Sequence, residues 1–157
     1  MRILNELSTY RLLGVIPQKS PFGPRDHALI RLALHTGLRV SEQTGLDVGH
    51  VLAQSGPREW LDLPFQIAKG HKSRRIPLSA GARRAVLELV EFLRMRGFTA
   101  DPTSPLLQDR RHRRLPVREV QRLVQRYREA ADLDLRVTPH SLRHTWASQM
   151  ARNNSLR

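Results

Sequence analysis

The stretch Thr36-Gly37-Leu38-Arg39-Val40-Ser41-Glu42 lies between two segments with helical periodicity and decides how the chain turns there. Apolar residues between Leu29 and Leu34 recur on one face of the preceding segment, which predicts a helix. Gly37 stands where the C-terminal cap of that helix would be. Ser41 is predicted to be the N-cap of a short second helix. The stretch therefore predicts two helices joined by a tight turn.

Two side chains of this stretch are candidates for chemistry. Arg39 lies at the junction, on a backbone that Gly37 allows to turn sharply. Glu42 lies in the first turn of the second helix, where a negative charge is favourable against the helix dipole. Gly-x-Arg turns at helix ends are common, so a purely structural role for this stretch stays open.

Downstream of the second helix the periodicity changes to that of strands. Between Glu59 and Leu78, short apolar runs on either side of Gly70 predict two or three short strands and a hairpin. The turn of this hairpin is basic and reads Lys69-Gly70-His71-Lys72-Ser73-Arg74-Arg75. A lysine at such a tip can reach into a substrate groove as a proton donor, or it can simply be solvated. Both interpretations stay open.

Helical periodicity returns after the hairpin. Ser79 is predicted to cap a long helix that ends at Gly97. After a loop over residues 99–115, Pro116 suits the first turn of the next helix, and a last helix is predicted roughly over 141–153. The chain is therefore predicted to be mainly α with a small antiparallel β-sheet, an α+β fold. Residues 1–24 are expected to be a leader or linker, and residues 25–157 one domain.

The charge of the chain points to a polyanionic partner. Its 157 residues carry 27 Lys+Arg against 14 Asp+Glu, a formal net charge of +13, and 24 of the basic residues are arginine. The planar guanidinium suits phosphate oxygens, so nucleic acid is the favoured partner. An anionic membrane surface or plain solubility are the alternatives. Arg118, Arg122 and Arg126 recur every four residues and form a basic ridge on one helix.

Several classes of protein are excluded by composition. The absence of cysteine excludes a disulfide scaffold, a thiolate metal site and a cysteine nucleophile. Apolar runs are broken well before the roughly 20 residues that a membrane span needs. The first residues contain no apolar run of signal-peptide length, so a cytoplasmic location, with no membrane partner, is expected.

A third pattern near the end of the chain complements the arginine turn and the hairpin lysine. It reads Thr138-Pro139-His140-Ser141-Leu142-Arg143-His144-Thr145-Trp146-Ala147-Ser148. His140 and Arg143 are three residues apart at a helix start, so both face one side, near the positive end of the helix dipole. A phosphate placed there would meet both side chains and the helix N–H groups. An exposed His and Arg at a helix start is the alternative.

Together these motifs resemble the catalytic domain of the tyrosine recombinase (phage integrase) family, over about residues 25–153. The strings T-G-L-R-x-S-E, K-G-x-K-x-R-x-x-P-L and P-H-x-L-R-H-T are those of its Xer-type and integron-type bacterial members. The resemblance implies the catalytic fold of that family and site-specific recombination of double-stranded DNA. It further implies association with other recombinase protomers and a place on the bacterial nucleoid.

The resemblance also assigns roles to individual residues. In this family a tyrosine hydroxyl attacks a phosphodiester and forms a 3′-phosphotyrosyl link, with no metal and no cofactor. The two arginines that stabilise the transition state match Arg39 and Arg143, the lysine that protonates the leaving 5′-oxygen matches Lys69, and the assisting histidine matches His140. Glu42 is expected to orient its neighbours. The residues expected to contact DNA are Lys72, Arg74, Arg75, Arg118 and Arg122.

The nucleophilic tyrosine of the family has no counterpart in this sequence. Tyr127 lies on the apolar stripe of a helix and is expected to be in the core, and Tyr10 precedes the catalytic motifs. The chain alone is therefore expected not to cleave or rejoin DNA. Three explanations stay open: a truncated recombinase, a remnant without a role, or a retained DNA-binding or regulatory module. The rival class is a basic nucleic-acid-binding protein of unrelated ancestry that uses the arginine ridge.

Overall fold

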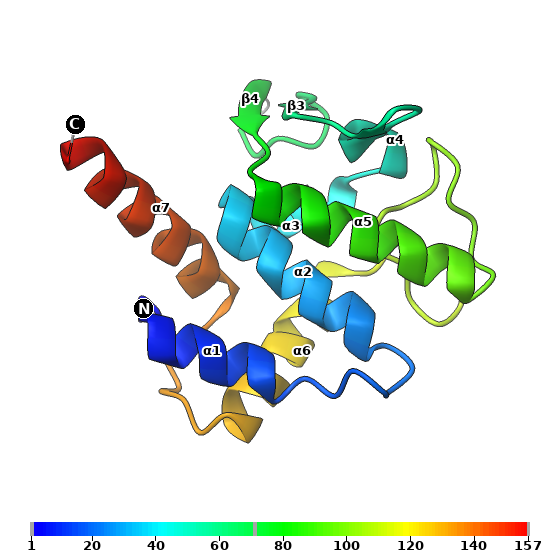
Figure 1. Ribbon diagram of the computed structural model, residues 1–157. Coiled ribbons are helices and arrows are strands. Elements are labelled where there is room, and N and C mark those ends of the chain that lie inside the picture. Colours follow the sequence, from blue (N-terminus) through cyan, green and yellow to red (C-terminus); the bar gives the residue numbers. More distant parts are fainter. Residues whose placement is uncertain (1, 71, 157) are drawn as a thin grey trace.

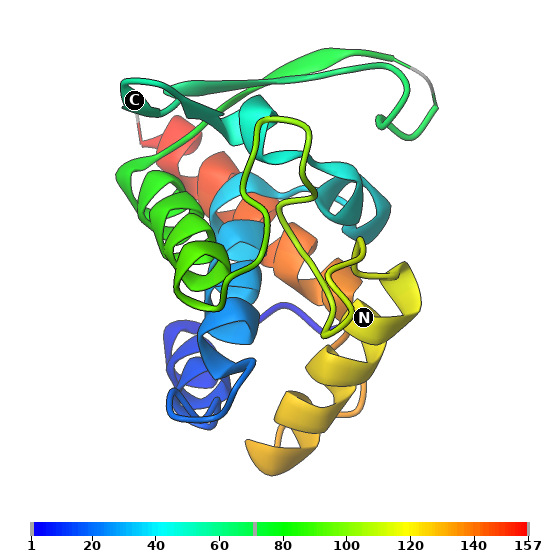
Figure 2. The same cartoon turned by 90° about the vertical axis from the view of Figure 1, so that its right-hand side faces the viewer.

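Two helices that are far apart in the sequence pack side by side at the centre of the molecule. They are α2 (Gly23–Thr36) and α5 (Ala80–Met95), seen together in Figures 1 and 2 of the computed structural model, which describes residues 2–70 and 72–156. α7 (Pro139–Ser155) packs on α2 as well. Buried apolar side chains from these helices form the core, because removing their surface from water is favourable.

The remaining elements surround this centre. They are α1 (Glu6–Gly14), α3 (Val40–Gly45), α4 (Val48–Val51), β1 (Leu52–Ala53), β2 (Gly56–Pro57), β3 (Trp60–Leu63), β4 (Arg74–Pro77) and α6 (Val117–Ala130). β1 pairs with β2 and β3 with β4, both antiparallel. The predicted α+β class, mainly helical with small antiparallel sheets, is confirmed.

The turn between α2 and α3 is as tight as predicted, but the N-cap residue of α3 differs from the predicted one. Gly37 is the C-cap of α2 with a φ of 66°, in the left-handed region that favours glycine. The prediction that Ser41 caps α3 was wrong, because Arg39 is the N-cap residue. Glu42, three residues after the N-cap, reaches back to it: its carboxylate accepts a hydrogen bond from the Arg39 backbone N–H at 3.0 Å. The start of α3 is thereby bonded to Glu42.

The predicted hairpin is the β3–β4 pair, which lies across one end of the molecule in Figure 2. Trp60 pairs with Pro77 and Leu63 with Arg74. The alternation on β3, with Leu61 and Leu63 buried, places one face of the strand on the core. Lys69 lies in the connection between the strands. His71, in the same predicted turn, lies outside the described residues.

The helices after the hairpin begin close to where they are predicted. Ser79 is the N-cap of α5, and its hydroxyl accepts a hydrogen bond from the Ala82 N–H. α6 begins at Val117 with Pro116 as its N-cap residue, one position before the predicted first turn. Along α7 the exposure changes: residues 149–156 are all exposed, and this half extends away from the other helices in Figure 1.

The first 24 residues, expected as a leader or linker, contribute to the same core. Leu4, Leu12 and Ile16 are buried within it. α1 lies against α6, where the Arg11 guanidinium donates to the Ala131 carbonyl at 2.6 Å. The segment is thereby packed onto the helices that follow it. Within residues 2–70 and 72–156, none of the helices combines the length and apolarity needed to cross a membrane.

Candidate active site

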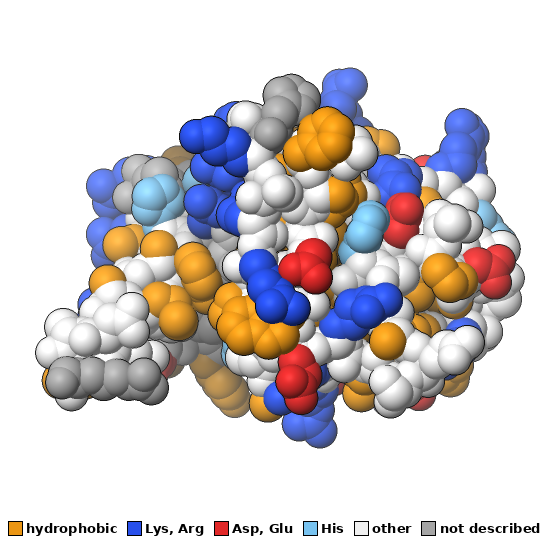
Figure 3. Space-filling view, turned by 90° about the horizontal axis from the view of Figure 1, so that it is seen from above, with side chains coloured by type: hydrophobic (Ala, Val, Ile, Leu, Met, Phe, Trp, Pro, Cys, Tyr) orange, Lys and Arg blue, Asp and Glu red, His pale blue; other side chains and the backbone are white. Residues whose placement is uncertain are grey.

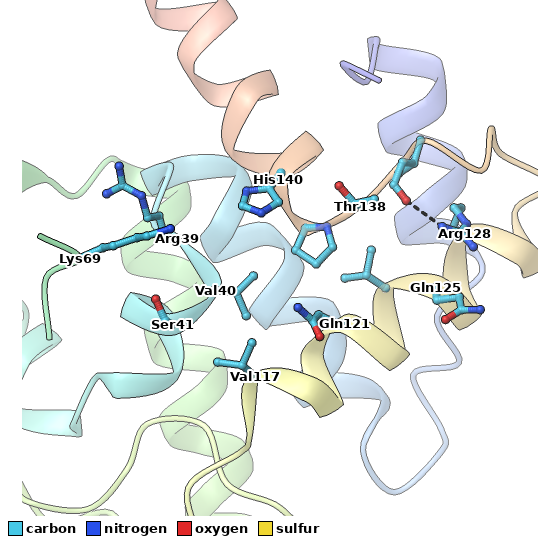
Figure 4. Close-up of a pocket in the computed structure, with 13 residues that line it drawn as sticks. Arg39, Val40, Ser41, Lys69, Val117, Gln121, Gln125, Arg128, Thr138 and His140 are labelled. Carbon is cyan, nitrogen blue, oxygen red and sulfur yellow. Dashed lines mark hydrogen bonds between the residues drawn. The ribbon is translucent and has the colours of Figure 1, made fainter. Parts of the chain in front are cut away.

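A cavity of about 480 Å³ opens between α3, α6 and the start of α7. Three of the residues singled out from the sequence, Arg39, Lys69 and His140, line one end of it, as Figure 4 shows. They come from three separate segments: the N-cap of α3, the β3–β4 connection and the first turn of α7. The fold therefore brings all three to one place.

Glu42 is the centre of the contacts behind this end of the cavity. Its side chain is fully buried (0% exposed) and accepts two hydrogen bonds from the Arg74 guanidinium, at 2.5 and 2.8 Å. It also accepts from the backbone N–H groups of Arg39 and Lys69, at 3.0 and 3.3 Å. One carboxylate thus ties together α3, β4 and the connection that carries Lys69.

The protonation of Glu42 follows from these contacts. Burial alone would raise the pKa of the Glu42 carboxyl, because a charge is disfavoured away from water. The hydrogen bonds from Arg74, Arg39 and Lys69 outweigh burial and lower the pKa from 4.5 to about 2. Glu42 is therefore ionised at neutral pH and holds its partners as a charged acceptor.

Arg143 lies beside the same group of side chains. Its guanidinium donates to the carbonyl of Gly37, in the turn that precedes Arg39. Burial lowers the pKa of Arg143, and the nearby positive charges of Arg39 and Arg74 lower it further. Neighbouring guanidinium groups repel one another, so an anion between them would be stabilised.

Trp146 covers the turn that contains Arg39 and whose Gly37 carbonyl accepts from Arg143. A Cβ atom added to Gly37 would lie 2.2 Å from Cε3 of the Trp146 ring, so the ring packs directly on the glycine backbone. A contact between Trp146 and this turn was not predicted from the sequence. The signal that could have found the contact is the positive-φ glycine, since only a residue without Cβ permits so close an approach.

The residues expected to contact DNA differ in their surroundings. Lys72 and Arg118 are exposed, and Arg75 is paired with Asp62 at 3.1 Å across the hairpin. Arg122 is exposed and pairs with Glu119 at 2.6 Å. Arg74 is held by Glu42 instead of standing free. Figure 3 shows Lys and Arg side chains gathered along part of the face that carries the hairpin, with few acidic side chains among them.

Both tyrosines lie outside the cavity lining. Tyr127 is buried, as predicted, and its hydroxyl donates to Asp26 at 2.6 Å. Burial and this hydrogen bond raise the pKa of Tyr127 to about 12. Tyr10 is 77% exposed on α1. A tyrosine held as a neutral donor in the core is a poor nucleophile.

The rest of the cavity was not anticipated from the sequence. It is lined by α6 and by the segment that leads into α7, and the residues are Val117, Gln121, Val124, Gln125, Arg128, Val137, Thr138 and Pro139. Arg128 donates hydrogen bonds to the carbonyls of Leu135 and Val137, at 3.0 and 3.1 Å, the latter drawn in Figure 4. No local motif marks these residues, because they meet only through the packing of α3, α6 and α7.

Comparison with known protein families and relatives gives a consistent result. The sequence matches the Phage integrase family over residues 3–156. It is 33% identical over 140 residues to tyrosine recombinase XerC of Salmonella typhi, covering 89% of this chain and 43% of the relative. It is also 33% identical over 156 residues to tyrosine recombinase XerC 1 of Ralstonia nicotianae, covering 91% and 46%. The chain thus spans less than half the length of these relatives.

Solved structures show the same fold at lower sequence identity. The crystal structure of XerA recombinase matches with a TM-score of 0.74 and 24% identity over 98% of this chain and 52% of that protein. XerH site-specific recombinase, bound to a palindromic difH substrate in a post-cleavage complex, matches with a TM-score of 0.76 and 21% identity, covering 98% and 42%.

Proposed function

Because the chain belongs to the phage integrase family of tyrosine recombinases, we propose that it is a DNA-binding catalytic segment of a site-specific recombinase. The observation that carries the proposal is the convergence of Arg39, Lys69 and His140 on one cavity, with Arg143 beside them. The substrate is double-stranded DNA. The net charge of +13 and the DNA-bound XerH neighbour both support this choice. Residues 25–157 form the catalytic unit, and residues 1–24 precede it.

Each proposed role has a chemical reason. In the reaction of this family, charge develops on the non-bridging oxygens of the phosphate as the tyrosine oxygen attacks. The forked donors of Arg39 and Arg143 are suited to stabilising that charge. Lys69 gives a proton to the departing 5′-oxygen, and His140 assists proton transfer or holds the phosphate. Glu42 is a positioning residue, since it accepts from the backbones of Arg39 and Lys69 and also pairs with the Arg39 guanidinium at 3.6 Å.

We expect a phosphate ion to report on this site directly. Titration of inorganic phosphate, followed by NMR of the backbone and arginine side chains, should perturb Arg39, Lys69, His140 and Arg143 together. Arg39→Gln should weaken phosphate binding about tenfold or more, because a charge-assisted bidentate contact is lost. Arg118→Gln, which removes an exposed arginine outside the cavity lining, is the matched control. Equal effects of the two substitutions would refute the convergence of these residues on one phosphate.

The chain alone should form no covalent link to DNA. It contains two tyrosines, one buried on Asp26 and one exposed on α1, and neither lines the cavity. Without a placed nucleophile, the family's phosphotyrosyl intermediate cannot form. The check is incubation with a nicked recombination-site duplex followed by a denaturing gel. A protein–DNA adduct that survives denaturation would contradict this expectation.

A second candidate function is a non-catalytic basic DNA-binding module with a regulatory role. The exposure of Lys72, Arg118 and Arg122 favours it, since backbone attraction needs no cavity. In that case Arg39→Gln, Lys69→Gln and Arg118→Gln would weaken duplex binding equally. The catalytic proposal instead predicts a larger loss for the first two on duplexes that present a recombination site.

The proposal extends to the setting of the protein. We expect it to bind DNA beside other recombinase protomers and to associate with the nucleoid of a bacterial cell. Sedimentation of the chain with and without a recombination-site duplex tests the first expectation. A single copy per duplex at all concentrations would contradict it.

A further inference from the structure

The cavity beside Arg39 is larger than a phosphate and changes character along its length. At one end lie the cationic groups of Arg39 and Lys69 together with His140. Five of the other lining residues are apolar, four valines and a proline: Val40, Val117, Val124, Val137 and Pro139. The remaining lining residues are polar: Ser41, Gln121, Gln125, Arg128 and Thr138. At about 480 Å³, it falls within the size range of pockets that hold small organic ligands. A phosphate alone would leave the half-buried apolar residues of the lining, Val40, Val117 and Pro139, uncovered.

These walls are held by internal contacts. Val124 and Val137 are buried in the core, while Val40 and Val117 are half-buried at the cavity surface. The Arg128 side chain, only 12% exposed, anchors the segment before α7 through its bonds to the carbonyls of Leu135 and Val137. Thr138 at the start of α7 donates its N–H to the Ser141 hydroxyl at 2.9 Å. The cavity is therefore largely pre-formed.

Gln121 is an exposed polar side chain beside the apolar residues of the lining. Within residues 2–70 and 72–156, the Gln121 amide takes part in none of the hydrogen bonds, whereas Gln125 donates to Glu129 at 3.2 Å. Figure 4 places Gln121 in the middle of the cavity, between the cationic end and Arg128. A primary amide offers both donors and an acceptor. The occupant therefore needs an anionic end, an apolar body and a polar edge.

A nucleoside attached to a phosphate has these three parts. Its base has apolar faces and a hydrogen-bonding edge, which amide side chains can recognise. A base stacked in a duplex cannot enter a cavity, whereas an unpaired one can be held between apolar side chains. We propose that this cavity binds one unpaired nucleoside joined to the phosphate held by Arg39, Lys69 and His140, with Gln121 on the edge of the base. This inference rests on the proposed function, because the phosphate end is shared.

Binding of three small ligands tests the phosphate end and the nucleoside part of this site separately. The chain is titrated with inorganic phosphate, 2-deoxyribose 5-phosphate and deoxyadenosine monophosphate, and dissociation constants are measured by NMR. We expect the nucleotide to bind about tenfold more tightly than the sugar phosphate, because the base buries apolar surface against aliphatic side chains. Equal affinity of the nucleotide and the sugar phosphate would overturn the nucleoside site and leave the phosphate site of the proposed function intact.

Two substitutions test the walls. Val117→Thr, an isosteric change in the first turn of α6, and Gln121→Ala should each reduce the preference for the nucleotide about threefold or more, with phosphate binding unchanged. Val15→Thr and Gln149→Ala, at a half-buried valine and an exposed glutamine outside the cavity, are matched controls. If the cavity variants and the controls behave alike, the base does not lie against these walls.

DNA provides the final distinction. Val117→Thr should weaken binding of a single-stranded 12-mer while leaving binding of the paired duplex unchanged. If the wild-type chain binds the duplex but Val117→Thr has no effect on binding of the single strand, the inference is overturned and only the proposed function is supported. Absence of duplex binding would count against the proposed function itself.

Discussion

At the scale of single residues, Glu42 does most to hold the candidate site together. Its buried carboxylate accepts hydrogen bonds from three segments of the chain, and the two from Arg74 form a bidentate pair. A buried pair of this kind is costly to break, because the remaining charge stays without its partner. Arg74 is about one-third exposed, so water offsets part of that cost.

Glu42→Gln is expected to destabilise the fold clearly. The substitution keeps the size of the side chain but removes the charge that Arg74 faces, and the free energy of unfolding should fall by about 2–3 kcal/mol. Urea denaturation measures the change. Asp62→Asn is the control, since it breaks the exposed pair with Arg75 and should cost less than about 1 kcal/mol. Similar losses for the two variants would show that burial of Glu42 matters little.

Acidification should weaken the contact between Glu42 and Arg74 over a defined range of pH. The pKa of Glu42 is lowered from 4.5 to about 2, so the folded state binds its proton less readily than the unfolded chain. Its contribution to stability is therefore complete above the unfolded value and is lost as the pH falls towards 2. Denaturation at a series of acidic pH values should show a shallower decline for Glu42→Gln than for the wild type. Parallel curves would contradict this assignment.

At the scale of elements, the α2–α3 turn joins the packing of α7 to the placement of Arg39. Gly37 adopts a φ of 66°, its carbonyl accepts from Arg143, and the Trp146 ring lies on it. Two elements distant in the sequence therefore meet at one residue without a side chain. Any side chain there would push α7 away from α2.

Gly37→Ala should be more harmful than the same change at Gly97. Both glycines have positive φ, at 66° and 71°, and share the backbone strain of roughly 1 kcal/mol that alanine suffers there. A Cβ at Gly97 would meet nothing within 4 Å, whereas at Gly37 it would overlap the Trp146 ring. We expect Gly37→Ala to cost at least about 2 kcal/mol more, measured by thermal or urea unfolding. Equal losses would mean that Trp146 moves aside freely.

At the scale of the whole molecule, the excess of arginine serves several purposes. Some guanidinium groups are used internally: Arg74 on Glu42, Arg25 on Asp26, and Arg114 on Asp47 and two carbonyl groups. Others, such as Arg118, stand exposed. The net charge of +13 therefore overstates the number of groups free to contact a polyanion.

The salt dependence of DNA binding should separate these two uses. Each phosphate contact adds about 0.9 to the slope of log affinity against log salt concentration. Lys72→Gln should lower that slope by about this amount, because Lys72 is exposed beside the hairpin. Arg74→Gln should leave the slope unchanged, since its guanidinium is bound to Glu42. Fluorescence anisotropy at several salt concentrations measures both, and a reduced slope for Arg74→Gln would place Arg74 on the DNA.

The sequence alone was sufficient for α2, α3, α5, α6 and α7, for the β3–β4 hairpin and for the family, but not for α4 or the β1–β2 pair. Apolar spacing, Ser79 and Gly37 determine where α5 begins and α2 ends, because caps and periodicity act over a few neighbouring residues. The N-cap at Ser41 was predicted wrongly because serine is a frequent cap, while here the Glu42 carboxylate bonds the backbone of Arg39 instead.

Other features were decided only by the tertiary structure. The pairing of Arg74 with Glu42, the Trp146 ring on Gly37 and the apolar walls beside Arg39 each join residues from different elements. Local patterns record which residues can cap a helix or face a core, since those preferences depend on neighbours in the chain. Which guanidinium meets which carboxylate depends on how α3, β4, α6 and α7 pack, and that is set by burial of the whole core at once.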